Sequence, residues 1–128
     1  MTNHPRRAVI AEDNPILREL IAKALGWAGP WEIVKVAEGG EALATIAAHG
    51  ANLVIVDWKM AGVDGLECTR RIRAGENGID RTIPVILVTA AGDELTEAMA
   101  GAVGVSRLLR KPFALTQLHQ AIQQLAGG

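Results

Sequence analysis

The chain has few of the residues that mark several large classes of protein. Its 128 residues include one cysteine, one phenylalanine and no tyrosine. A single cysteine excludes an internal disulfide and fits a reducing compartment, so we expect a cytoplasmic location. Thirteen basic and fourteen acidic side chains give a formal charge of −1, which favours neither nucleic acid nor a membrane as a partner. No apolar run approaches the roughly 20 residues of a membrane span, and the first residues lack a signal-peptide core.

Short apolar runs alternate with helical patterns five times along the chain. The runs cover residues 8–11, 33–36, 53–56, 85–88 and 106–110. Strands that alternate with helices predict right-handed crossovers and a parallel sheet covered on both faces. We therefore expect one α/β domain, a three-layer sandwich with strand order 2-1-3-4-5 and the second strand at an edge. The domain should span residues 7–126, with a flexible N-terminus at residues 1–6 and no output domain.

The helical segments carry recognisable start signals and apolar stripes. Asn14 or Asp13 can cap the first helix, with Pro15 near its first position. The apolar stripe of this helix should comprise Ile16, Leu17, Leu20, Ile21, Ala24 and Leu25. In the second helix we expect Ala42, Leu43, Ile46 and Ala47 to face the core, and in a fourth helix from about Asp93 we expect Leu95, Ala98, Met99 and Ala102.

Polar residues follow four of the apolar runs. Glu12 and Asp13 follow the first run, Asp57 the third, Thr89 the fourth and Lys111 the fifth. Ligands of open α/β sheets bind outside the carboxyl ends of the strands. The sequence therefore predicts that three carboxylates, a hydroxyl and an ammonium gather at one edge of the sheet. That set suits a divalent cation and a phosphoryl group.

The predicted strand order makes the first and third strands neighbours, which brings Glu12 and Asp13 close to Asp57. Like charges at that range repel, and each carboxyl resists ionisation beside the others. A hard cation with oxygen ligands would supply the counter-charge, and Mg²⁺ commonly combines one or two protein carboxylates with water and a phosphate oxygen. Taken singly, these residues have plainer roles: helix capping for the acidic pair, local backbone bonding for Thr89 and a surface position for Lys111.

Over residues 7–126 the chain resembles the receiver domains of two-component response regulators, of the single-domain chemotaxis-receiver type. The resemblance rests on Glu12 with Asp13, Asp57 with Met60, Asp64 with Gly65, Thr89 with Ala90, and Lys111 with Pro112 and Phe113. It implies a flavodoxin-like (βα)₅ fold. It also implies that Asp57 is the phosphoacceptor and that Glu12, Asp13 and Asp57 hold Mg²⁺ as the cofactor, helped by the backbone carbonyl of Lys59.

The same resemblance implies roles for the remaining strand-end residues. Thr89 would donate a hydrogen bond to the phosphoryl group, and Lys111 would pair with it. The peptide bond between Lys111 and Pro112 would be cis, which is otherwise a minority state. Lys59 and Ala91 would lie beside the path of the water that removes the phosphoryl group. Since Ala91 is small and leaves that path open, we predict that Ala91→Arg slows dephosphorylation.

The resemblance implies a stand-alone receiver whose partners are a sensor histidine kinase or a histidine phosphotransfer protein. Phosphorylation would then switch binding to an unidentified protein target. Such a chain is not an enzyme in the usual sense, because it catalyses only its own phosphorylation and dephosphorylation. The alternative is a phosphorelay intermediate that passes the phosphoryl group to a histidine phosphotransfer protein.

The chain departs from the receiver pattern on its fifth strand. Leu108 stands where receivers commonly carry an aromatic residue that rotates inward on phosphorylation. Leucine has no ring to expose, so a shift of Thr89 would act by repacking Leu108 against the fourth helix. We expect the response, and the contact with the target, on the face made by the fourth helix, the fifth strand and the fifth helix.

Two other classes that use similar features fit less well. A flavin binder of the same strand order would cradle the flavin phosphate in the first strand-to-helix loop, where Glu12 and Asp13 would repel it. A dehalogenase-type phosphohydrolase needs a carboxylate two residues after its aspartate nucleophile, and Lys59 occupies that position.

The remaining polar and aromatic residues have structural explanations. The histidines lack metal-ligand spacing, Cys68 and Trp58 are expected to pack, and an arginine cluster in the third helix should be solvated or dock an acidic partner. These residues are His4, His49, His119, Cys68, Trp58, Arg70, Arg71 and Arg73.

Overall fold

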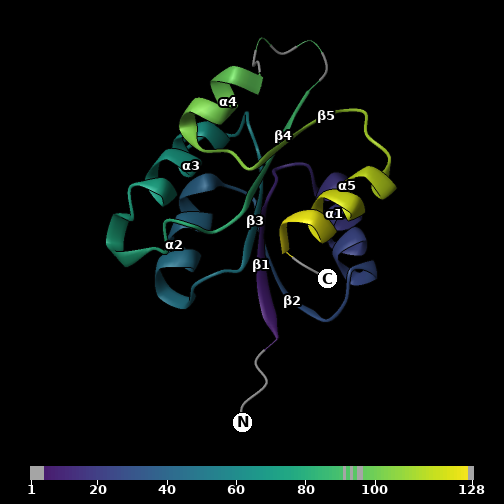
Figure 1. Cartoon of the computed structure of the whole chain (residues 1–128), viewed down its shortest axis with the longest axis horizontal. Coiled ribbons are helices and arrows are strands. Elements are labelled where there is room, and N and C mark those ends of the chain that lie inside the picture. Colours follow the sequence, from purple (N-terminus) through teal and green to yellow (C-terminus); the bar gives the residue numbers. More distant parts are fainter. Residues whose placement is uncertain (1–4, 91, 93, 95–96, 127–128) are drawn as a thin grey trace.

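The structure is a computed structural model that describes residues 5–90, 92, 94 and 97–126. Helices follow strands along the chain, as Figure 1 shows. The strands are β1 (Arg6–Ala11), β2 (Trp31–Val36), β3 (Leu53–Asp57), β4 (Val85–Thr89) and β5 (Arg107–Arg110). The helices are α1 (Pro15–Trp27), α2 (Gly39–His49), α3 (Gly65–Arg73), the 3₁₀ turn η1 (Glu76–Gly78), α4 (Glu97–Val103) and α5 (Leu115–Ala126). Among the helices described, none is long and apolar enough to cross a membrane.

The five strands form one parallel sheet in the order β2-β1-β3-β4-β5. This arrangement confirms the predicted α/β class and strand order. All five residues of β3 and all five of β4 are buried, as expected for central strands covered on both faces. No residue of β2 is fully buried, and the strand lies at one edge of the sheet, as predicted.

Side chains that alternate along the strands fill two cores, one on each face of the sheet. Val9 and Ala11 of β1 lie in the core that α2, α3 and α4 cover, whereas Ala8 and Ile10 lie in the core covered by α1 and α5. Figure 1 shows the same division, with α1 and α5 on one side of the sheet and α2, α3 and α4 on the other. The result is the predicted three-layer sandwich.

The structure corrects several sequence-based boundaries and faces. Strand β1 begins at Arg6, so that residue is not part of a flexible N-terminus; residues 1–4 and 127–128 lie outside the described part. In α1, Ile16 is 74% exposed and Leu20 is 40% exposed, because the helix rests on the sheet through its other apolar residues, which include Ile21 and Leu25. The predicted stripe was therefore too wide.

Two other predicted faces were also wrong. Ala47 of α2 is exposed, and in α4 it is Ala100 that packs into the core, while Ala98, Met99 and Ala102 face solvent. The many small residues of α4 left its orientation poorly marked in the sequence. The described helix begins at Glu97, and the predicted start near Asp93, together with Leu95, falls outside the described residues.

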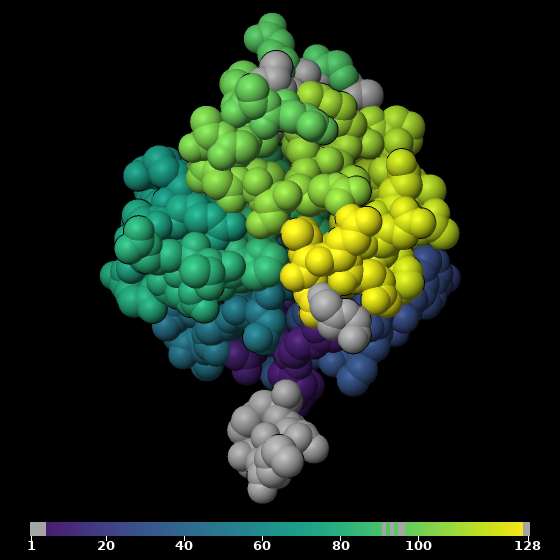
Figure 2. All heavy atoms as spheres, in the orientation of Figure 1, coloured from purple at the N-terminus to yellow at the C-terminus, as the bar shows by residue number. Residues whose placement is uncertain are grey.

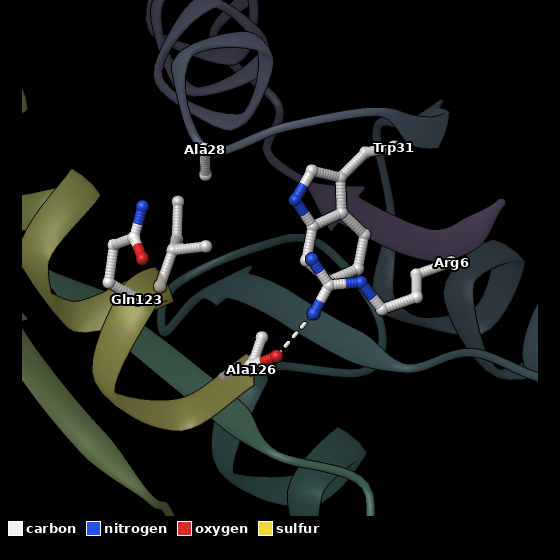
Figure 3. A pocket seen from close by; sticks show the side chains of 6 residues that line it. Arg6, Ala28, Trp31, Gln123 and Ala126 are labelled. Carbon is white, nitrogen blue, oxygen red and sulfur yellow. Dashed lines mark hydrogen bonds between the residues drawn. The ribbon is translucent and has the colours of Figure 1, made fainter. Parts of the chain in front are cut away.

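A stacked arginine fastens the C-terminal end of α5 to the sheet. The guanidinium carbon of Arg6 lies 4.3 Å from the centroid of the Trp31 ring, and its Nη1 donates a hydrogen bond to the carbonyl oxygen of Ala126 (Figure 3). Arg6 is on β1 and Trp31 on β2. These contacts lie at the ends of β1 and β2 where the strands begin, opposite the edge where the predicted site should be.

Arg73 connects three segments near the end of α3, and it is not part of a solvated cluster. Its guanidinium donates to the carbonyl oxygens of Gly104 at 2.9 Å, Arg81 at 2.8 Å and Ile83 at 2.7 Å. Arg70 and Arg71 behave differently, since both pair with Glu67 on the surface of the same helix. The predicted arginine cluster therefore divides into one structural residue and two surface residues.

Candidate functional site

The carboxyl ends of four strands meet at one edge of the sheet and bring the predicted polar residues there. Glu12 and Asp13 directly follow β1, Asp57 is the last residue of β3, Thr89 the last of β4, and Lys111 directly follows β5. The parallel registers of neighbouring strands make these ends coincide, with Ala11 opposite Val56 and Asp57 opposite Val88.

Three carboxylates form the centre of this site. Glu12, Asp13 and Asp57 each offer an oxygen, and these atoms all lie within 4.8 Å of one another. Glu12 is 1% exposed and Asp57 is 7% exposed, whereas Asp13 is open to solvent. Two of the three acids are therefore buried, and Asp13 is the one that solvent reaches.

The two oxygens of the Glu12 side chain have different surroundings. Oε2 accepts a hydrogen bond of 3.1 Å from the backbone N–H of Asn14. Oε1 is buried and accepts no hydrogen bond from the residues that the structure describes. The nearest cation is the Lys111 ammonium, with Nζ 3.7 Å from Oε1. A buried carboxylate oxygen with no donor is costly unless another positive group reaches it, so this atom fits a cation ligand.

Lys111 brings an ammonium group to the buried acids. Its Nζ lies 3.5 Å from Oδ2 of Asp57, at the limit of a hydrogen bond. Its backbone N–H donates a 2.7 Å hydrogen bond to the carbonyl oxygen of Thr89, whose side chain is fully buried. The peptide bond between Lys111 and Pro112 is cis. The ammonium therefore stands between Asp57 and Glu12 and is joined through the backbone to the end of β4.

Burial makes the acids of the site reluctant to ionise. Removal from water raises the pKa of Glu12 from 4.5 to about 7, and the negative charge of Asp57 adds to the rise. The Asn14 N–H and the Lys111 ammonium act in the opposite direction. Burial likewise raises the pKa of Asp57, against the lowering effect of Lys111. The single lysine thus leaves an uncompensated need for positive charge, which a hard divalent cation bound by these oxygens could meet.

Gly65 allows α3 to begin directly against the site. A Cβ atom at this position would lie 2.5 Å from the carbonyl oxygen of Asp57 and 2.5 Å from Cδ1 of Leu87. The Gly65 N–H also donates to the carbonyl oxygen of Trp58 at 2.8 Å, and the Asp64 side chain caps α3 by accepting from the N–H of Glu67. The sequence indicated a turn here but gave no sign of this close approach.

The other predicted site residues lie around this centre. Lys59 is exposed, and its Nζ lies 4.8 Å from the centroid of the Trp58 ring. Leu108 is half-buried and packs against the core on the α4 side, with Leu87 as its partner on β4. Ala91 lies outside the described residues. The binding of a cation by the backbone carbonyl of Lys59 remains an implication of the resemblance.

One residue that contacts the site was missed at the level of sequence. Arg18, on the first turn and a half of α1, donates from Nη1 to the backbone carbonyl oxygen of Glu12 at 2.9 Å. Its position four residues after the capping Asn14 places it over the start of the helix, and this spacing was the available signal. An arginine at that distance from a cap has many possible partners, so the contact needed the structure.

Comparisons with known proteins place these features in a family. Residues 8–123 match the response regulator receiver domain. The phosphate regulon transcriptional regulatory protein PhoB of Pseudomonas aeruginosa is 34% identical over 110 residues, which are 86% of this chain and 47% of that protein. The CAI-1 autoinducer sensor kinase/phosphatase CqsS of Vibrio cholerae is 32% identical over 111 residues, 87% of this chain and 16% of that protein.

A solved structure agrees over the whole fold. The receiver domain of sensor histidine kinase PA1611 from P. aeruginosa PAO1 is 28% identical with a TM-score of 0.82, and the match covers 98% of this chain and 100% of that one. That structure contains a magnesium ion coordinated in its active-site cleft. The chain spans about half the length, or less, of the curated relatives it matches. The match over residues 8–123, the strand order and the set of strand-end residues together show that the chain belongs to the response regulator receiver domain family.

Proposed function

We propose that the Asp57 carboxylate accepts a phosphoryl group from a phosphohistidine of a sensor kinase or phosphotransfer protein, and that this change switches binding to another protein. One observation carries the proposal. Asp57 lies at a strand end with its Oδ2 atom 3.5 Å from the Lys111 ammonium, within a group of three carboxylates. Membership of the receiver family supports the same reading.

The proposed transfer forms one bond and breaks one. An oxygen of Asp57 attacks the phosphorus, and the bond from phosphorus to the imidazole nitrogen of the donor breaks, with its electron pair leaving on that nitrogen. A carboxylate is a weak nucleophile toward an anionic phosphoryl group, so the rate depends on positioning and on neutralising the oxygens. The Lys111 ammonium and the Thr89 hydroxyl are the groups of this chain that we assign to those oxygens.

We assign Mg²⁺ to the oxygens of Glu12, Asp13 and Asp57. The buried Oε1 of Glu12, without a hydrogen bond from the described residues, fits a cation ligand, and Asp13 is open to the solvent from which the ion would enter. Bound there, Mg²⁺ would neutralise charge on the phosphoryl oxygens. The magnesium in the cleft of the related P. aeruginosa receiver supports this assignment. On this proposal the chain acts on no other molecule and catalyses only its own phosphorylation and dephosphorylation.

We assign the readout to the face formed by α4, β5 and α5. Figure 2 shows these elements side by side on one face of the molecule, in green to yellow. Leu108 lies in this face and pairs in register with Leu87, two residues before Thr89 on β4. A shift of Thr89 toward a phosphoryl group would therefore reach Leu108 through the neighbouring strand, and from there the packing under α4.

The assignment of Asp57 is tested with a small phosphodonor such as acetyl phosphate. The wild-type chain should gain one hydroxylamine-labile phosphoryl group in the presence of Mg²⁺ and none after chelation by EDTA, as measured by intact mass. Asp57→Asn should remain unlabelled, whereas the exposed control Asp80→Asn should be labelled normally. Labelling of Asp57→Asn at the wild-type level would refute the assignment.

Phosphorelay is a second candidate, favoured by similarity to two proteins of the sensor-kinase class. One is the sensor kinase/phosphatase CqsS, and the other is the receiver of PA1611. A relay intermediate would return its label to a histidine, so the labelled chain should transfer phosphate to a purified histidine phosphotransfer protein within minutes. Retention of the label, with phosphate-dependent binding to a different protein, would support the switch.

A further inference from the structure

Arg18 makes an unusual contact for a cation at the start of a helix. It lies in α1, where its backbone N–H forms the helical hydrogen bond of 2.9 Å to the carbonyl oxygen of Asn14. Its side chain runs back toward the N-terminal end of α1, as helical side chains do, and Nη1 donates to the carbonyl oxygen of Glu12 at 2.9 Å. The contact joins α1 to the loop that carries two of the three carboxylates.

The backbone of Glu12 is held on both sides. Its N–H donates to the carbonyl oxygen of Val36 at 3.1 Å, and its carbonyl oxygen accepts from Arg18. The side chain is held at one oxygen by the Asn14 N–H. With these three attachments in place, the oxygen that remains for a further partner is Oε1, which lies in the carboxylate group with Asp57.

Helix stability does not explain this placement of Arg18. The N-terminal end of a helix carries partial positive charge and disfavours cations, and the first turn of α1 has no acidic residue to offset it. The contact with Glu12 is the interaction that places the guanidinium there. Since the acceptor is a backbone atom, the contact fixes the direction of the chain as it leaves β1 and so the direction of both acidic side chains.

Arg18 has two opposite effects on a cation at the carboxylates. Its positive charge repels the ion, while the hydrogen bond holds the ligands in place and lowers the entropy cost of binding. Arg18 is only partly buried, so solvent screens the repulsion. Partners that orient metal ligands commonly change metal affinity by about 10–100-fold. Orientation should therefore outweigh charge.

We propose that Arg18 is a positioning residue for the cation site, and that its hydrogen bond to the Glu12 carbonyl oxygen holds the Glu12 and Asp13 carboxylates toward Asp57. The proposal rests on the proposed function, in which these three residues bind Mg²⁺. It adds a residue outside the ligand set, on a different element, whose loss should weaken the site without removing any ligand.

The experiment is an Mg²⁺ titration of the full chain, followed by ¹H–¹⁵N chemical shifts of backbone amides near Asp57. Arg18→Met removes both the donor and the charge, Arg18→Gln removes the charge but keeps a donor, and Arg18→Lys keeps the charge with a different donor geometry. We expect Arg18→Met to weaken Mg²⁺ binding about tenfold, with Arg18→Gln and Arg18→Lys intermediate. Lys23→Met, which removes an exposed cation from the same helix, should bind as the wild type does.

The outcomes distinguish the positioning role of Arg18 from the proposed Mg²⁺ site on which it rests. If the wild-type chain binds no Mg²⁺, the proposed cation site fails. If the wild type binds Mg²⁺ and Arg18→Met binds it equally or more tightly, the positioning role is refuted. An equal increase of Mg²⁺ affinity in Arg18→Gln and Arg18→Met would show that only the charge of Arg18 matters. Thermal unfolding without Mg²⁺ checks that the variants are folded, and Arg18→Lys decides the question should Arg18→Met unfold.

Discussion

The backbone N–H of Lys111 donates a 2.7 Å hydrogen bond to the carbonyl oxygen of Thr89. This bond continues the ladder between β4 and β5 by one residue, since Thr89 is already paired with Arg110. The two residues that we assign to the phosphoryl oxygens therefore belong to one rigid piece of sheet edge. We expect a movement of the Thr89 backbone to carry the Lys111 backbone with it, whereas the two side chains can still rotate independently.

Lys111→Met should separate cation binding from switching. The lost ammonium lies 3.5 Å from Asp57 and 3.7 Å from Glu12, where it competes with a bound cation. Ion pairs of a partly exposed lysine are typically worth less than ~1 kcal/mol, so removal of the ammonium should raise Mg²⁺ affinity about threefold. The phosphorylation-dependent change on α4 and β5 should be lost. Lys35→Met, which removes an exposed lysine paired with Glu19, is the control and should change neither property.

The raised pKa of Glu12 predicts opposite pH dependences with and without Mg²⁺. Its pKa is about 7 in the folded chain and near 4.5 when unfolded, so the folded state binds more protons between these values. Without Mg²⁺, the free energy of unfolding should fall as pH rises from 4.5 to 7 and then level off. Mg²⁺ displaces that proton, so its affinity should increase over the same range. Urea unfolding at several pH values checks both. Glu12→Gln should reduce both pH dependences, and what remains is due to Asp57, whose pKa burial also raises. A rise in metal-free stability over this window would contradict the assignment.

Gly65→Ala should destabilise the chain because its Cβ would meet backbone. The added atom would lie 2.5 Å from the Asp57 carbonyl oxygen and from Cδ1 of Leu87. Forcing such a contact typically costs about 1–3 kcal/mol. The matched control is Gly101→Ala in α4, where a Cβ meets nothing within 4 Å, and this change should stabilise the helix by about 0.5–1 kcal/mol. Equal effects of the two substitutions in urea unfolding would show that α3 can shift away from the site.

Much of the fold was readable because the physical signals were strong and local. Apolar runs ending in Asp57 and Thr89 mark central parallel strands, and their ends must meet at one sheet edge. The orientation of α4 was not readable, since its alanines and glycine give every face a similar hydrophobicity. Ala100 is buried there because of how the helix packs on its neighbours, which is a tertiary effect.

The gathering of the acidic residues at one sheet edge could be predicted from the sequence, but the contacts that hold them there could not. The sequence marks the acidic residues clearly, because Glu12, Asp13 and Asp57 are charges that follow apolar runs. Arg18 and Gly65 are not marked in this way, because their importance lies in one hydrogen bond and one close approach that depend on how α1 and α3 dock. A sequence pattern records the type of each residue, whereas such contacts are set by distances between elements far apart in the chain.

Arg73→Gln should lower stability far more than the same change at Arg70. The Arg73 guanidinium supplies donors to three backbone carbonyls, and a shorter side chain leaves them without those donors. Loss of such bonds typically costs about 1–3 kcal/mol in total. Arg70 is exposed and pairs only on the surface with Glu67, so Arg70→Gln should leave the urea midpoint unchanged. Similar midpoints for the two variants would rule out a structural role for Arg73.

Phosphorylation should change amide exchange on the proposed readout face. With a beryllofluoride mimic bound, we expect altered protection in residues 97–120, because the shift of Thr89 repacks Leu108 under α4. The amplitude should be modest, since leucine has no ring to move between exposed and buried positions. Asp57→Asn treated in the same way should show no change. Changes confined to the neighbourhoods of Glu12, Asp57 and Thr89 would show that this face does not carry the signal.

The contacts of Arg6 with Trp31 and Ala126 hold the C-terminal end of α5 in place. The last turn of this 12-residue helix is tied to β1 and β2, while the helix begins four residues after Lys111 in the sequence. A helix of that length spans about 18 Å, so a displacement of ~1 Å at its first turn, with the last turn held, would be a rotation of about 3°. On the proposed readout, a movement that starts at the sheet edge would therefore reach α5 as a tilt about its C-terminal end. A protein bound along α5 would then meet a displacement that is largest at the first turn of the helix and smallest at its last turn.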